Sequence, residues 1–152
     1  QNRKALSSIN LGSAKKQKRL LPEGDAKTRY QSAFGYLRKR EFRKAELALK
    51  EFLTTHPDDP LVPNAMYWLG ETYYTRGKYE DAAEIFISGY EQHSESSKTP
   101  DNLLKLGLSL LKLERRADAC IAFAQLLSEF PNSSKSLTRR AINERKRHGC
   151  PA

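Results

Sequence analysis

The feature that most constrains this chain is an internal repeat with a period of 37 residues. A shift by that distance places Leu69-Gly70 on Leu106-Gly107 and Pro63 on Pro100. The same shift aligns small and large apolar positions in three copies: Ala45, Ala82 and Ala119, and Leu49, Phe86 and Phe123. Periods of roughly 20–50 residues are typical of solenoids and propellers, so the chain is expected to stack three similar units.

Each copy predicts a pair of amphipathic helices. In the second copy Ala65, Met66, Leu69 and Tyr73 recur at three- and four-residue steps, and Gly77 follows where the chain must turn. The pattern predicts helices at about 26–39, 42–55, 63–76, 79–92, 100–113 and 116–129, and a seventh at about 134–148 capped by Ser133 or Ser134. The expected fold class is all-α: three helical hairpins and a C-terminal capping helix, stacked as a solenoid.

These hairpins resemble the tetratricopeptide repeat, whose usual period is about 34 residues. The longer period here indicates three extra residues in each connection between hairpins, in "HPDDPLVPNA" and "HSESSKTPDN". A tetratricopeptide-repeat solenoid is thus expected over residues 26–152, with repeats at about 26–62, 63–99 and 100–133. The first repeat departs most, because Ser32-Ala33 stands where Leu-Gly is expected. Residues 1–25 are expected to form a basic, flexible linker.

The net charge of +9 comes from the two ends of the chain. Residues 1–29 hold eight Lys or Arg and two Asp or Glu, residues 134–152 hold six and one, and the middle is nearly neutral. This distribution favours solvated basic ends over a specific nucleic-acid site, and leaves open weak binding to an anionic polymer. No apolar run approaches the roughly 18–20 residues of a membrane span.

The two cysteines, Cys120 and Cys150, are expected to pair. If helices 116–129 and 134–148 run antiparallel, the start of one lies beside the end of the other, within reach of a disulfide. An oxidising compartment would permit the bond. The alternative is a buried Cys120 and a free Cys150; a zinc site is disfavoured because the paired ligand spacing is missing.

Nothing in the sequence groups residues for catalysis. Gly70 and Gly107 are too isolated for a phosphate-binding loop, and no Ser, His and acid residues cluster. The expectation is a protein without enzymatic activity, catalytic residues, metal or cofactor.

A closer resemblance comes from "FLTTHPDDPLVPNAMYWLGETYYTRGKYEDAAEIF". Its Pro63-Asn64-Ala65 and Tyr67-Trp68-Leu69-Gly70 blocks and the later "FPNS" resemble the Tol-Pal-associated periplasmic tetratricopeptide proteins, the cell division coordinator family. The resemblance implies a periplasmic adaptor that binds TolA and links outer-membrane constriction to septal peptidoglycan synthesis through a penicillin-binding protein. It also implies a signal peptide and an N-terminal coiled coil, outside this sequence, through which the protein could form homo-oligomers.

The expected binding surface lies on the first helices of the hairpins, which line the inner wall of such solenoids. Aligning the copies on Gly70 selects the groove residues Tyr30, Phe34, Asn64, Tyr67, Trp68, Glu71, Tyr74, Leu104, Lys105 and Leu108. Aromatic side chains at these positions are suitable anchors for a peptide. The alternative is that some of them pack between repeats, and Trp68 is the most ambiguous.

Two other functions remain open at this point. One is a different envelope protein-binding module of the outer-membrane assembly type, which similar repeats would serve. The other is an anionic-polymer binder that acts through its basic ends, for which binding would depend strongly on salt.

Overall fold

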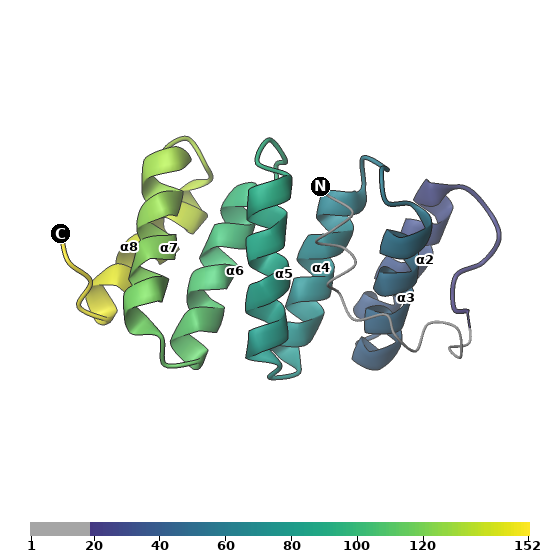
Figure 1. The fold of residues 1–152 in the computed structure, drawn as a ribbon, viewed down its shortest axis with the longest axis horizontal. Helices are drawn as coiled ribbons and strands as arrows, with labels where there is room; N and C mark the ends of the chain where they lie inside the picture. The colour runs from purple at the N-terminus through teal and green to yellow at the C-terminus, as the bar shows by residue number, and fades with distance from the viewer. Residues whose placement is uncertain (1–18) are drawn as a thin grey trace.

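The structure, a computed structural model, describes residues 19–152. In this part of the chain it contains seven α-helices and no strands, with the helices side by side in chain order (Figure 1). They are α2 (Ala26–Arg38), α3 (Phe42–Thr55), α4 (Val62–Thr75), α5 (Tyr79–Gln92), α6 (Thr99–Lys112), α7 (Arg116–Glu129) and α8 (Lys135–Arg147). The expected all-α solenoid of three hairpins and a final helix is confirmed, and every helix boundary lies within one residue of its expected position.

Each hairpin turns through a residue in the left-handed backbone region at the same place in the repeat. These residues are Arg40 with φ 60°, Gly77 with φ 77° and Glu114 with φ 60°. The next amide bonds back to a carbonyl of the preceding helix in all three turns: Glu41 to Tyr36 at 2.9 Å, Lys78 to Tyr73 at 2.9 Å and Arg115 to Leu110 at 2.8 Å. The helix pair therefore imposes the turn even where no glycine is present.

A missing Cβ sets the distance between the helices of the second and third hairpins. A Cβ on Gly70 would lie 2.4 Å from the Phe86 ring, and a Cβ on Gly107 would lie 2.3 Å from the Phe123 ring. In the first hairpin the equivalent pair is Ala33 and Leu49, both fully buried. The smaller partner side chain makes room for the alanine, which explains why the first repeat departs from the pattern.

The last helix, α8, has little apolar surface in the core. Its buried residues are Ala141 and Glu144. A disulfide joins Cys120 on α7 to Cys150 beyond α8, with the Cα atoms 5.5 Å apart. The bond therefore holds a helix that hydrophobic packing alone holds weakly.

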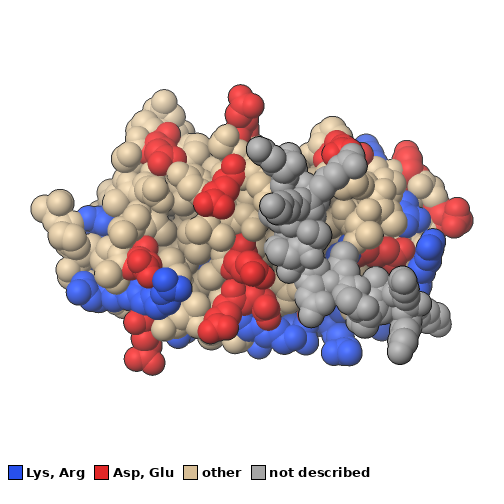
Figure 2. Space-filling view, in the orientation of Figure 1, with Lys and Arg blue, Asp and Glu red and all other residues tan. Residues whose placement is uncertain are grey.

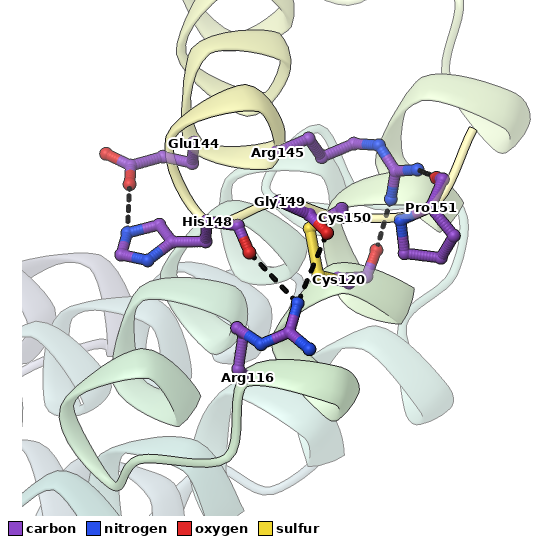
Figure 3. The surroundings of a disulfide bond; sticks show 8 residues. All are labelled: Arg116, Cys120, Glu144, Arg145, His148, Gly149, Cys150 and Pro151. Carbon is purple, nitrogen blue, oxygen red and sulfur yellow. Dashed lines mark hydrogen bonds and ion pairs between the residues drawn. A yellow bond between two sulfur atoms is a disulfide. The ribbon is translucent and has the colours of Figure 1, made fainter.

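Two arginines add to this attachment (Figure 3). Arg116 on α7 donates to the carbonyl of His148 at 2.9 Å, and Arg145 on α8 donates to the carbonyl of Cys120 at 2.7 Å. Each guanidinium thus joins α7 to the C-terminal segment by a hydrogen bond close to the disulfide.

The expected linker begins outside the described residues and ends in a docked segment. The amides of Leu20 and Leu21 donate to Glu51 Oε1 on α3 at 2.9 and 3.3 Å, and Leu21 is buried. Asp25 caps α2 by accepting from the amide of Thr28 at 2.9 Å. This corrects the expectation of a free linker up to residue 25, because Leu21 reaches the core of the first hairpin. Across residues 19–152, no helix has the length and apolar character needed to cross a membrane.

Candidate functional site

Side chains of α2, α4 and α6 form the candidate site, which we call the first-helix face. The face contains the ten residues expected to line a groove, and the structure leaves seven of them half-buried: Tyr30, Phe34, Asn64, Trp68, Glu71, Tyr74 and Lys105. The repeat geometry brings these residues to one side of the stack, because first helices follow one another at a fixed spacing.

Aromatic rings from α2 and α4 touch across the junction between the first two hairpins. The Tyr30 and Phe34 rings lie 6.3 Å apart, and Phe34 meets Trp68 edge-on at 5.1 Å between centroids. Trp68 in turn lies 5.1 Å from Tyr67. Burial raises the pKa of Tyr30, while hydrogen bonding with Asn64 and Trp68 opposes that rise. The rings form one continuous cluster rather than separate anchors.

The structure corrects the expected exposure of three groove residues. Tyr67 is 7% exposed, Leu104 is 7% exposed and Leu108 is 6% exposed, so all three belong to the core. The Tyr67 ring packs 5.9 Å from the Phe86 ring, and its hydroxyl donates to Glu71 at 3.4 Å. Burial, with the nearby charges of Glu71 and Asp101, raises the pKa of Tyr67 far above its ordinary value. Packing between hairpins, the alternative considered above, therefore accounts for these side chains.

Cations cover the aromatic rings on this face. Lys98 Nζ lies 5.0 Å from the Tyr67 ring centroid and 5.3 Å from that of Trp68. Lys105 lies 5.1 Å from the Tyr74 ring, and Arg38 lies 5.4 Å from the Phe34 ring. These distances are within the range of cation–π attraction. Half-buried rings beneath positive charges are suited to a peptide that carries both apolar and acidic side chains.

Two carboxylates partly offset the positive charge of this face. Glu71 on α4 pairs with Lys105 on α6 at 3.2 Å, which links adjacent first helices. Burial raises the pKa of Asp101, although Lys98 and Lys105 act in the opposite direction. Both acids lie among the lysines, so a bound acidic group would compete with them for the same cations.

Sequence reasoning missed Lys98, which contacts two of the rings. Lys98 precedes α6, in the connection between hairpins, whereas the groove positions were selected from the helices alone. One signal in the sequence could have pointed to it. The 37-residue shift aligns Lys98 with the uncharged Leu61, so this position gains a positive charge in the next repeat. Among the described residues, no group of three or more His, Cys, Asp or Glu side chains could hold a metal ion.

Comparison with known families agrees with this geometry. Family models described as tetratricopeptide repeat match residues 30–96 and residues 101–133. The chain is built from tetratricopeptide repeats. Its fold is accordingly that of a scaffold for protein–protein interaction.

Two curated relatives share part of the repeat region. Both are cell division coordinator CpoB proteins of Pseudomonas putida, one of them from strain KT2440, and each is 38% identical over 48 residues. This stretch is 32% of the present chain and only 18% of each relative's length. The similarity is therefore confined to about one and a third repeats.

A solved structure of MamA AMB-1 has a similar architecture. It superposes with a TM-score of 0.64 over 98% of this chain and 81% of that chain, at 20% sequence identity. At this level of identity the likeness concerns the fold alone. It shows that the whole described stack, and not one repeat, follows tetratricopeptide geometry.

Proposed function

We propose that the protein is a periplasmic adaptor that binds a TolA-like component of the Tol-Pal system on its first-helix face. In this role it would coordinate outer-membrane constriction with septal peptidoglycan synthesis, in contact with a penicillin-binding protein. The observation that carries the binding site is that three half-buried rings of this face, Phe34, Trp68 and Tyr74, each lie beneath a cation: Arg38, Lys98 and Lys105 respectively. The limited similarity to cell division coordinators supports the choice of partner.

The disulfide supports the proposed compartment. Disulfides form and persist in oxidising compartments such as the periplasm. The Cys120–Cys150 bond attaches a helix with few apolar contacts, so a reducing compartment would leave α8 poorly held.

The test is a calorimetric titration of the chain with the periplasmic part of TolA, at low and moderate salt. Trp68→Ala is expected to weaken binding at least about tenfold, since central aromatic residues dominate such interfaces. Tyr90→Ala removes a ring on α5, outside the first-helix face, and serves as the matched control. Circular dichroism checks that both variants remain folded.

Lys98→Ala provides a second variant that leaves the core intact. It is expected to weaken binding while preserving the thermal unfolding midpoint. Failure of the unaltered protein to bind TolA would reject this partner. Binding that Trp68→Ala and Lys98→Ala leave unchanged would reject the first-helix face, and binding abolished by moderate salt in every variant would favour the basic ends instead.

A further inference from the structure

The side of the stack formed by the second helices has a separate groove between α5 and α7, which we call the α5–α7 groove. Its volume is about 620 Å³. Leu106 and Leu110 of α6, and Leu113 directly after α6, line it together with Ile87 of α5 and Ile121 of α7. Ile87 is 40% exposed and Ile121 is 57% exposed, so two β-branched side chains lie in contact with water on its walls.

The preceding junction, between α3 and α5, has polar side chains at the equivalent positions. There Glu46 accepts from Lys50 at 2.9 Å and pairs with Arg76, while Lys50 lies 5.7 Å from the Tyr73 ring. Moving forward by 37 residues replaces these four residues by apolar ones: Ala83, Ile87, Leu113 and Leu110. At one junction these positions therefore hold an ion network, and at the next they line an apolar groove on the same backbone.

The rim of the α5–α7 groove is acidic, although the chain as a whole is basic. Glu80 and Glu84 line it from α5, and Asp118 lines it from α7. One cation, Arg115, also lines the groove, and it already forms an ion pair with Asp118 at 2.7 Å. Figure 2 shows acidic side chains gathered over α5 on this side of the molecule. In a chain of net charge +9, this local reversal of sign favours a basic partner over an acidic one.

The dimensions of the groove match a short helix. Its lining spans residues 80–87 of α5, residues 106–113 at the C-terminal end of α6 and residues 118–125 of α7. Seven residue steps of a helix cover about 10.5 Å, the distance between apolar side chains at positions i and i+7 of a bound helix. A helix lying along the groove would cover the exposed isoleucines on both walls.

We propose that the α5–α7 groove binds a basic amphipathic helix of a partner protein. Aliphatic side chains at positions i, i+4 and i+7 of that helix would contact the three lining leucines, and flanking Lys or Arg would face Glu80 and Glu84. This site is separate from the first-helix face and does not rest on the function proposed above. A protein with both sites would hold two segments at once, an acidic one and a basic one.

The test uses a synthetic helical peptide of 14 residues, with Leu at positions i, i+4 and i+7 and Lys on the flanking positions. Its affinity for the full chain is measured by fluorescence anisotropy, beside a peptide in which Glu replaces every Lys. Ile121→Lys places a cation in the groove without disturbing the core. Ile142→Lys is the matched control, because Ile142 is a 38% exposed isoleucine on α8, outside the groove.

The Lys peptide is expected to bind, Ile121→Lys to weaken it at least about tenfold, and Ile142→Lys and Trp68→Ala to leave it unchanged. Equal binding of the Glu peptide would overturn the proposed charge preference. Equal binding by Ile121→Lys would overturn the site. Sedimentation that reveals a dimer of the unaltered chain, lost in Ile121→Lys, would assign the groove to a second copy and overturn the proposal of a partner helix.

Discussion

Gly70 and Gly107 show how a single missing Cβ decides the separation of two helices. Each faces the ring of a phenylalanine in the second helix of its own hairpin, at distances that no Cβ could occupy. The first hairpin reaches a similar arrangement with alanine and leucine at these positions. The size of the residue at this point of the first helix thus depends on the size of its partner on the second helix: glycine faces phenylalanine, and alanine is paired with leucine.

Gly70→Ala is expected to lower the free energy of unfolding by about 1–3 kcal/mol, because the Phe86 ring would have to move within a packed core. Gly35→Ala is the control. The nearest atom to a Cβ on Gly35 is a terminal nitrogen of Arg38 at 3.9 Å, so the better helix propensity of alanine is expected to add about 0.5–1 kcal/mol. Urea unfolding followed by circular dichroism measures both. Changes of the same sign would contradict the close-packing argument.

Glu46 supplies a pH-dependent contribution to stability. Burial alone would raise its pKa, but Lys50 and Arg76 outweigh this effect and hold the pKa below its ordinary value of 4.5. A carboxyl whose pKa is lower in the folded chain binds fewer protons there than in the unfolded chain. It therefore stabilises the fold above about pH 4.5, and this stabilisation disappears as the pH falls through the folded pKa.

Glu46→Gln is accordingly expected to cost roughly 1 kcal/mol at pH 7 and progressively less below about pH 4. Glu84→Gln, at an exposed site on α5, is expected to change stability by less than about 0.5 kcal/mol at either pH. Denaturant unfolding at several pH values gives the comparison. A loss at pH 3 as large as that at pH 7 would show that the charge of Glu46 is not the cause.

Among the elements, α8 depends most on contacts other than apolar packing. The disulfide closes a loop with a sequence separation of 30 residues, and the helix itself buries Ala141 and Glu144. Near its start, the Ser134 hydroxyl caps the helix by accepting from the amide of Leu137 at 3.2 Å. Local sequence thus starts the helix, while the disulfide and two arginines attach it.

Cys150→Ser is expected to lower stability by up to about 3–4 kcal/mol in the chain-entropy description of disulfides. The loss should appear first as faster hydrogen exchange in α8. Reduction of the unaltered protein should reproduce it, whereas the reductant should have no further effect on Cys150→Ser. If the reductant leaves the melting curve of the unaltered protein unchanged, the bond is not what attaches α8.

For the whole molecule, burial is concentrated in the middle of the stack. The first helix of the second hairpin, α4, buries eight residues and α6 buries nine, whereas α2 buries Ala33 alone. In a solenoid each unit contacts only its neighbours, and α2 and α8 are the first and last helices of the described stack. Opening from both ends is the expected consequence.

Native-state hydrogen exchange is therefore expected to show the slowest amides in α4 to α7 and faster exchange in α2 and α8. Exchange in α8 should become still faster when the disulfide is reduced, whereas exchange in α2 should be unaffected and can serve as the internal reference. Uniform protection of all the described helices would instead indicate that the stack unfolds as one cooperative unit.

The helices and their order could be predicted from the sequence because their causes are local. Apolar residues at three- and four-residue steps, prolines in the first turns of α4 and α6, and the 37-residue period together specified the hairpins to within one residue. The position of the turn was also clear from Gly77. The sequence did not predict that Arg40 and Glu114 adopt the same left-handed conformation, because the packed helix pair imposes it.

The surfaces could be predicted only in outline. The sequence placed aromatic residues on the first helices, but the burial of Tyr67 depends on the Phe86 ring beneath it, and Lys98 reaches Trp68 from the connection that precedes α6. The walls of the α5–α7 groove are likewise apolar because Ala83 and Ile87 stand where Glu46 and Lys50 form an ion pair one repeat earlier. Periodicity along the chain therefore determined the repeat and its hairpins. The exposure of each side chain was decided by tertiary structure, because it depends on which neighbours the stacked repeats bring from distant parts of the sequence.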